Sequence, residues 1–145
     1  MIQIIFAVKG RQSLINPSWE ERLFQYVTQI VQNKGQKILA INGMPDHIHL
    51  LIGMKPDCRI SDLVREIKKS SNSFINQNKL VKGKFSWQSG YGVFSYGSSQ
   101  KDKIVRYIMN QKEHHRKMVF RDEYRSFLEK FEIDFQEKYL FEWIE

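Results

Sequence analysis

Two histidines separated by one apolar residue, His47-Ile48-His49, are the part of this sequence best suited to chemistry. On a β-strand, successive side chains point to opposite faces, so both imidazoles would emerge on one face while Ile48 and Leu50 turn toward a core. Imidazole binds several divalent metals, and a pair on one rigid strand would form a preorganised metal clamp. The spacing alone fits two surface histidines on a half-buried strand equally well.

A tyrosine and a glutamine four residues apart supply a second set of functional groups. Apolar residues between positions 104 and 109 recur at helical spacing and mark the buried stripe of a helix expected over residues 98–117. At 100° per residue, Tyr107 and Gln111 lie about 40° apart, beside that stripe. A phenol and a carboxamide at the margin of a core can face the histidines of a neighbouring strand. The alternative is a tyrosine whose ring packs and whose hydroxyl reaches water.

The elements that must position these groups follow the order βαββαβα, with a further short helix. The expected strands cover residues 2–8, 37–42, 46–54 and 83–96, and the expected helices cover residues 17–33, 62–75, 98–117 and 122–131. Residues 43–46 suit a hairpin turn between the second and third strands. This order predicts an α+β fold of the ferredoxin-like or RRM-like type: a four-stranded antiparallel sheet, helices mainly on one face, the other face open, and a C-terminal helix and tail.

The charge of the chain divides it into a basic body and an acidic extension. The 145 residues suit one domain with a sizeable core, and the net charge is +7. Residues 1–119 carry 19 Lys and Arg against 8 Asp and Glu, whereas residues 120–145 carry 4 against 8. The basic surplus predicts a polyanionic partner, most simply nucleic acid, although charge that serves only solubility is the alternative.

Other sequence features exclude several classes of protein. Cys58 is the only cysteine, so no disulfide can form within the chain. No apolar segment approaches the roughly 18 residues of a membrane span, and the N-terminal residues lack the pattern of a secretory signal. No glycine-rich segment matches a P-loop, so we expect no nucleotide cofactor. A cytoplasmic protein without a membrane partner is the simplest expectation.

Three motifs in this order resemble the single-tyrosine HUH transposases of small insertion sequences, which move as single-stranded DNA, and their domesticated, palindrome-cleaving relatives. Residues 44–52 (MPDHIHLLI) resemble the histidine motif of that family, residues 85–91 (FSWQSGY) its tryptophan–glycine strand, and residues 107–111 (YIMNQ) its tyrosine helix. The resemblance spans nearly the whole chain and favours the metal clamp over two surface histidines.

The resemblance implies a DNA strand transferase with a divalent metal, Mg²⁺ or Mn²⁺, held by His47, His49 and Gln111. Tyr107 would attack the scissile phosphate, forming a 5′-phosphotyrosine and releasing a 3′-hydroxyl, and strand transfer would reverse this step. A phenol with a pKa near 10 is a poor nucleophile at neutral pH, so it needs assistance. The candidates for assisting the phenol or orienting a metal ligand are Asp46, Lys112, His114 and His115.

The family resemblance also implies the partners. The DNA would be single-stranded with hairpin ends, and the enzyme would be a homodimer in which the tyrosine helix of one subunit can complete the histidine pair of the other. The residues considered for DNA contact are basic or aromatic: Lys9, Arg11, Arg65, Lys68, Lys69, Lys79, Lys82 and Lys84 for phosphates, and Trp87 or Tyr91 for base stacking.

Alternatives remain open at this point. A non-catalytic nucleic-acid-binding module of the RRM type would share the fold. A metal-dependent hydrolase is disfavoured because the sequence suggests no carboxylate beside the histidines other than Asp46. The acidic extension, residues 120–145, either packs on the body and closes an apolar face or uses its carboxylates to regulate access to the DNA channel.

Overall fold

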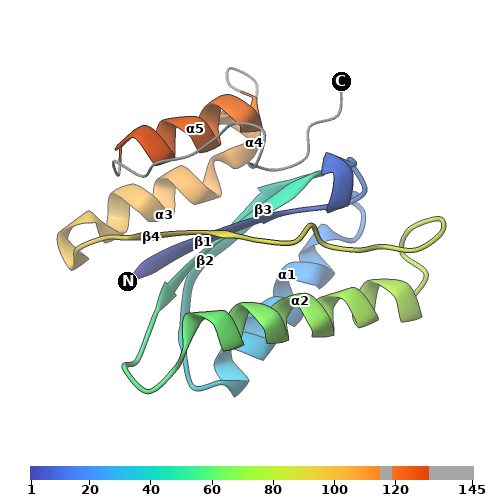
Figure 1. Cartoon of the computed structure of the whole chain (residues 1–145), viewed down its shortest axis with the longest axis horizontal. Coiled ribbons are helices and arrows are strands. Elements are labelled where there is room, and N and C mark those ends of the chain that lie inside the picture. The colour runs from blue at the N-terminus through green and yellow to red at the C-terminus, as the bar shows by residue number, and fades with distance from the viewer. Residues whose placement is uncertain (115–118, 131–145) are drawn as a thin grey trace.

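The computed structural model describes residues 1–114 and 119–130, and it has the expected order of strands and helices (Figure 1). The strands are β1 (Ile2–Ala7), β2 (Lys37–Met44), β3 (His47–Gly53) and β4 (Gly92–Ser95). The helices are α1 (Glu20–Asn33), α2 (Ile60–Gln77), α3 (Lys101–Met109), α4 (Gln111–His114) and α5 (Phe120–Lys130), with 3₁₀ turns at Lys9–Arg11 and Ser98–Gln100. No helix in these two ranges is both long and apolar enough to cross a bilayer.

The four strands form one antiparallel sheet in the order β2-β3-β1-β4, which confirms the ferredoxin-like arrangement. Strand β3 is central, because β1 and β2 pair with its two edges. His49 lies opposite Ile5 of β1 and Asn42 of β2, and His47 lies opposite Ala7 and Met44. Backbone pairing on both sides therefore fixes the position of the two histidines.

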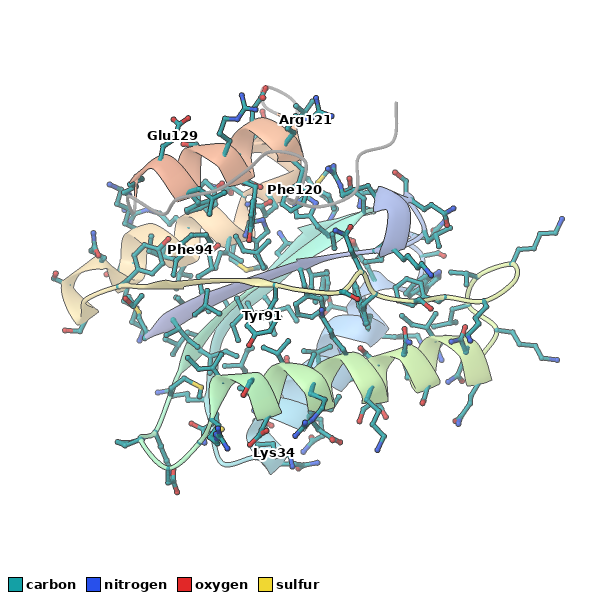
Figure 2. The ribbon with its side chains drawn as sticks, viewed as in Figure 1. Lys34, Tyr91, Phe94, Phe120, Arg121 and Glu129 are labelled. Atoms are coloured by element: carbon teal, nitrogen blue, oxygen red, sulfur yellow. The ribbon has the colours of Figure 1, made fainter. Side chains whose placement is uncertain are left out.

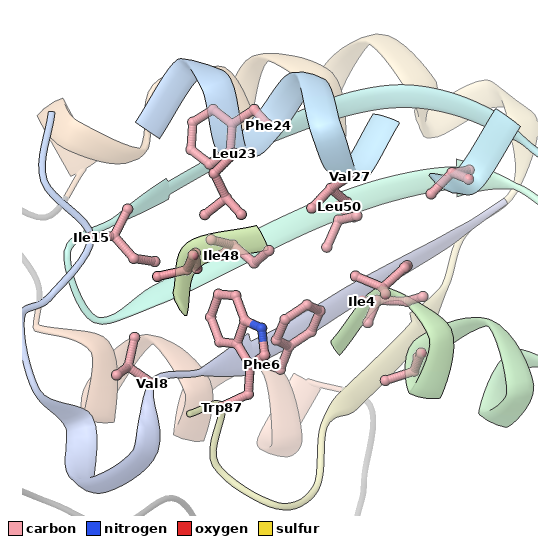
Figure 3. Close-up of a cluster of buried hydrophobic side chains, with 14 of the residues drawn as sticks. Ile4, Phe6, Val8, Ile15, Leu23, Phe24, Val27, Ile48, Leu50 and Trp87 are labelled. Carbon is pink, nitrogen blue, oxygen red and sulfur yellow. The ribbon is translucent and has the colours of Figure 1, made fainter. Parts of the chain in front are cut away.

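Helices α1 and α2 cover one face of the sheet. Ile48 and Leu50 of β3 point into this layer, where they meet Leu23 and Val27 of α1 and Ile67 of α2 (Figure 3). All five side chains are fully buried. The apolar positions of both helices recur at helical spacing, so burial of one stripe per helix stabilises this layer.

The opposite face is covered as well, contrary to the expectation that it stays open. Helices α3 and α5 lie on this side of the sheet in Figure 1, and Ile5, Leu51 and Phe94 of the strands pack against residues of both helices. Phe120 of α5 belongs to the same cluster and is 2% exposed (Figure 2). These apolar strand residues would otherwise face water. Helix α5 therefore closes an apolar face, which is the first of the two alternatives that the sequence leaves open for the extension. Residues 131–145 of the extension lie outside the described part of the chain.

Two elements are shorter than expected. Strand β4 begins at Gly92 rather than near residue 83. The preceding segment places Phe85 in the core and is held beside the end of β1 by an isolated bridge between Val8 and Trp87 and by a hydrogen bond of 2.8 Å from the backbone nitrogen of Gln88 to the oxygen of Ala7. The helix expected over residues 98–117 ends at Met109, and a separate turn of helix starts at Gln111. The backbone oxygen of Met109 accepts a hydrogen bond of 3.0 Å from Asn42 of β2, which fixes α3 beside the histidine strand.

Close packing of α5 on β4 predicts a requirement for glycine at position 92. A Cβ atom on Gly92 would lie 2.9 Å from Cε2 of Tyr124 and would also overlap its hydroxyl. We expect Gly92→Ala to lower the free energy of unfolding by about 1–3 kcal/mol, because the buried ring must shift. Gly53→Ala is the matched control, since its Cβ would lie 3.7 Å from Cβ of Lys37. Urea denaturation measures both, and equal stability of the two variants would contradict this packing.

Candidate active site

The two histidines are fully buried beneath α3 and α5 rather than exposed on a sheet surface. Their alternation with Ile48 and Leu50 is as expected: the apolar pair faces α1 and α2, and the imidazoles lie on the other face. The ring centroids of His47 and His49 are 5.1 Å apart. Phe120 of α5 stacks on the His47 ring at 3.9 Å, with an interplanar angle of 11°. Helix α5 therefore covers the histidine pair on the side away from the sheet.

The Nδ1 atom of each histidine is held by an oxygen acceptor. Nδ1 of His47 lies 2.7 Å from Oδ1 of Asp46, and Nδ1 of His49 lies 2.8 Å from Oε1 of Gln3. Gln3 is fixed in turn, since its Nε2 donates to the Tyr96 hydroxyl at 2.9 Å. Both acceptors favour a proton on Nδ1, which leaves the Nε2 lone pairs for a ligand.

The charge states of Asp46 and His47 suit metal binding. Burial raises the pKa of Asp46, but its hydrogen bond with His47 and the nearby Arg11 guanidinium outweigh this and lower the value to about 2. Nε of Arg11 donates to Oδ2 of Asp46 at 3.0 Å. Burial lowers the pKa of His47 to about 4, against the opposing effect of Asp46. Asp46 is therefore ionised and His47 neutral at pH 7, the form in which imidazole binds a cation.

A carboxylate from the acidic extension completes the cluster. Oε1 of Glu123, on α5, lies 3.3 Å from Nε2 of His49 and 3.7 Å from Nε2 of His47. The three potential ligand atoms lie within 4.8 Å of one another, and Glu123 is only 1% exposed. The expectation that no carboxylate other than Asp46 accompanies the histidines is wrong. The signal for Glu123 in the sequence is its place on the apolar stripe of a helix, next to Tyr124 and three residues after Phe120.

Gln111 lies in the same cluster, as its spacing from Tyr107 predicts. Its side chain is fully buried, and its Nε2 donates to Oε2 of Glu123 at 3.3 Å. Among the described residues, neither Oε1 of Gln111 nor Nε2 of His49 has a hydrogen-bond partner. Buried polar atoms are normally satisfied, so these two acceptors indicate a ligand that donates or carries positive charge.

Tyr107 reaches this cluster within the same chain. Its hydroxyl donates a hydrogen bond to Oε2 of Glu123, and its ring centroid is 6.1 Å from that of His49. Burial raises the pKa of Tyr107, and the negative charge of Glu123 raises it further, so the phenol is protonated at neutral pH. A cavity of about 250 Å³ between α3 and α5 borders Tyr107 and Glu123, with Lys103 and Phe127 in its lining.

The other candidates for assisting the phenol are placed elsewhere or lie outside the described residues. Nζ of Lys112 lies 2.7 Å from Oε1 of Glu20 and 3.4 Å from the backbone oxygen of Gly43, so its charge is engaged on the α1 and β2 side. The side chain of His114 and all of His115 lie outside the described part of the chain.

Six of the basic residues considered for DNA contact are exposed. They are Lys9, Arg65, Lys69, Lys79, Lys82 and Lys84. Lys9 and Lys84 line a common cavity of about 410 Å³, next to Ser86. Arg65 pairs with Asp62 at 2.8 Å on the surface of α2. The Lys9–Lys84 cavity is thus a recess bordered by two exposed lysines.

Two further basic residues have structural partners. Arg11 is held by Asp46, behind the histidine pair. Nζ of Lys68 donates to the backbone oxygen of Gln88 at 2.8 Å, and burial lowers the pKa of Lys68 to about 8. Lys68 therefore supports the segment before β4 instead of joining a cationic patch with Lys69.

The two aromatic candidates differ in exposure. Trp87 is 8% exposed, packs edge-on against Phe6 and Phe85, and donates from Nε1 to Oγ of Ser71 at 2.9 Å. Tyr91 is 37% exposed. The structure thus places Trp87 in the core and leaves Tyr91 as the exposed ring of the two.

Comparison with known proteins decides the family. The pattern that describes IS200-like transposases matches residues 1–111. The chain belongs to this family. The resemblance carried by the three motifs is thereby confirmed, and the matched segment contains His47, His49, Tyr107 and Gln111 but ends before Glu123.

Individual relatives agree with this assignment. The transposase is 26% identical to the ISDra2 transposase TnpA of Deinococcus radiodurans over 113 residues, which are 74% of this chain and 81% of the relative. A crystal structure described as a transposase of the same species is 28% identical, with a TM-score of 0.60 over 76% of this chain and 88% of that one. A REP-associated tyrosine transposase bound to a REP hairpin shares the fold, with a TM-score of 0.61, 18% identity, and coverage of 79% and 67%.

Proposed function

We propose that this transposase cleaves and rejoins single-stranded DNA with hairpin ends through a 5′-phosphotyrosine on Tyr107. The observation that carries the proposal is the convergence, within one chain, of the Tyr107 phenol with a buried pair of histidines. The ring of His49 is 6.1 Å from that of Tyr107, and both residues contact the Glu123 carboxylate. Nucleophilic catalysis at a phosphate requires such a nucleophile beside a group that binds the phosphate.

The residues present fit a divalent cation. Nε2 of His49 faces Oε1 of Glu123 at 3.3 Å, and with Nδ1 protonated these are two acceptors that repel each other unless a cation or proton lies between them. His47, His49 and Gln111 would hold Mg²⁺ or Mn²⁺, beside the Glu123 carboxylate. Carboxamide and carboxylate oxygens are ligands that suit Mg²⁺ and Mn²⁺. The cation would supply positive charge to the oxygens of the scissile phosphate.

Tyr107 performs the bond-forming step. Its Oη attacks the phosphorus, the bond from phosphorus to the 3′ oxygen breaks, and the DNA segment downstream of the cut stays attached to the enzyme through its 5′ phosphate. The phosphodiester energy is conserved in this intermediate, so a new 3′-hydroxyl can displace Tyr107 without a nucleotide cofactor. The Tyr107 side chain is partly buried against Phe127 of α5, which restricts the access of water to the intermediate.

The hairpin substrate is supported by a structural neighbour and by surface charge. The REP-associated tyrosine transposase that shares this fold is bound to a REP hairpin. Exposed lysines, including Lys9 and Lys84 at a common cavity, would contact phosphates, and Tyr91 would stack on a base. We further propose a cytoplasmic homodimer. A domesticated, palindrome-cleaving role would use the same site and the same chemistry.

A covalent adduct tests the proposal. Labelled single-stranded DNA that contains an imperfect hairpin is incubated with protein and Mn²⁺ and analysed by denaturing electrophoresis. We expect a labelled band that migrates with the protein and disappears after protease treatment. Glu123 supplies the carboxylate that a metal-dependent hydrolase needs, so a free 5′-phosphate product without adduct would favour that second function.

Asp46 is predicted to support metal binding through His47. Asp46→Ala removes the acceptor that fixes the ring orientation of His47 and its proton on Nδ1. We expect Mn²⁺ affinity to fall about 10–100-fold, as is typical when the partner of a ligating histidine is removed. Calorimetric titration measures the affinity. Asp62→Ala, at an exposed pair with Arg65, is the control, and equal affinities in the two variants would contradict this role of Asp46.

A further inference from the structure

We propose that Glu123 is the general base that accepts the phenolic proton of Tyr107 and returns it during strand transfer. This inference rests on the proposed function, because it assigns the proton transfer in the same nucleophilic step. Glu123 lies on α5, beyond the segment that matches the family pattern and within the extension that the sequence alone leaves without a role in the chemistry.

The two oxygens of the Glu123 carboxylate face different groups. Oε2 accepts the hydrogen bond from the Tyr107 hydroxyl and a second one from Nε2 of Gln111 at 3.3 Å. Oε1 points instead to the histidines, 3.3 Å from Nε2 of His49. One carboxylate thus connects the nucleophile to the imidazole pair. A general base must lie within hydrogen-bond reach of the proton it removes, and Oε2 meets this condition.

Packing on both sides of Glu123 fixes its position. Phe120, one turn earlier on α5, stacks on His47, and Tyr124 packs against Gly92 of β4. The carboxylate is 1% exposed, so water does not compete strongly for its oxygens. Because the packed helix already fixes this carboxylate, little conformational entropy is lost when it accepts the phenolic proton.

The proton transfer balances the nucleophilic step. The bond from Oη of Tyr107 to phosphorus forms, the bond from phosphorus to the 3′ oxygen breaks, the phenolic proton moves to Oε2 of Glu123, and the released 3′ oxygen takes a proton from solvent. In the reverse step the incoming 3′-hydroxyl gives its proton to solvent, and Tyr107 recovers its own from Glu123. The carboxylate is neutral while the phosphotyrosine exists, which removes one negative charge from beside the phosphate.

The weak acidity of a phenol makes such a base necessary. A phenol ordinarily has a pKa near 10, so phenolate is scarce at neutral pH. Of the other groups considered from the sequence, Lys112 is engaged with Glu20. Removal of the proton as the new bond forms avoids the need for a free phenolate, and general-base catalysis of this kind contributes about 10²–10⁴-fold to a rate.

Single-turnover formation of the covalent adduct tests the inference in the full-length protein with Mn²⁺ and labelled hairpin DNA. Glu123→Gln keeps the size of the side chain but cannot accept the proton, and we expect the rate to fall about 10²–10⁴-fold. The exposed Glu129, which points away from the molecule on the same helix, provides the control variant Glu129→Gln with an unchanged rate (Figure 2).

A more acidic phenol separates proton transfer from structural roles. With 3,5-difluorotyrosine at position 107, the phenol needs less assistance to lose its proton. Glu123→Gln should therefore lower the rate of adduct formation by a markedly smaller factor than it does with tyrosine. Glu123→Asp keeps a carboxylate but places it farther from Tyr107. Its rate of adduct formation should lie between those of the unaltered protein and Glu123→Gln, and difluorotyrosine should restore part of that rate as well. Mn²⁺ affinity and thermal unfolding of each variant are measured in parallel, so that a lost ligand or a lost fold is identified.

Distinct results would overturn the inference. An unchanged rate in Glu123→Gln, or an equal loss with both phenols, would show that Glu123 accepts no proton. A faster rate in Glu123→Gln would show that the carboxylate obstructs the site instead. If the unaltered transposase formed no adduct at all, the proposed function itself would fail, and that result is separate from a failure of Glu123 alone.

Discussion

Replacement of Tyr107 by phenylalanine is expected to abolish the covalent adduct between the transposase and hairpin DNA. The substitution removes a single oxygen, the atom that would become bonded to phosphorus. The Tyr107 ring centroid lies 6.1 Å from that of His49 and 5.6 Å from that of Phe127. These ring contacts involve no hydroxyl and remain possible in the variant. We expect the rate of DNA cleavage to fall at least about 10³-fold, because no other group takes over from a removed nucleophile.

DNA binding and stability distinguish loss of the nucleophile from loss of the fold. Glu123 keeps the hydrogen bond from Gln111 when the phenol is removed, so we expect the variant to lose no more than about 1–3 kcal/mol of unfolding free energy. Tyr26→Phe, at a ring stacked on Phe74 in the other layer, is the control and should form adduct at the unaltered rate. Adduct that persisted in Tyr107→Phe would assign the nucleophile to another residue.

The histidine strand could be predicted from sequence because its features are local. Alternation of side chains depends only on strand geometry, and Ile48 and His49 do lie on opposite faces of the sheet. The spacing of Tyr107 and Gln111 was similarly informative, although the helix ends between them, because both side chains stay on the side that faces the histidines.

Glu123 could not be placed in the same way, because its role depends on contacts between distant segments. Position 123 lies 76 residues after His47, and the two meet only because α5 packs on a sheet face expected to be open. The burial of Trp87 is a similar case. The sequence suggests a ring that could stack on a base, whereas the indole lies in the core and donates a hydrogen bond to Ser71. Such choices depend on how two layers fit together, which spacing within one element does not encode.

A buried carboxylate beside two imidazoles is costly unless positive charge compensates it. Burying an ion in a protein costs several kcal/mol, and the hydrogen bonds from Tyr107 and Gln111 compensate only in part. A cation at His47 and His49 would supply the missing charge. The same cluster that performs chemistry would therefore tie the stability of the α5 layer to metal binding.

Mn²⁺ is accordingly expected to stabilise the transposase, and His47→Ala combined with His49→Ala to abolish both this stabilisation and the adduct. A ligand at 100 times its dissociation constant stabilises the folded state by about 2.7 kcal/mol, and thermal unfolding with and without Mn²⁺ measures the shift. The double variant is compared with itself in the absence of metal, so any cavity left by the rings cancels. Cys58→Ser, which alters the lone thiol, is the control and should keep the full shift, because Cys58 lies outside the cluster of His47, His49 and Glu123. A shift of equal size in the double variant would mean that Mn²⁺ binds elsewhere, and the two imidazoles would then not be the ligands on which the phosphate chemistry depends.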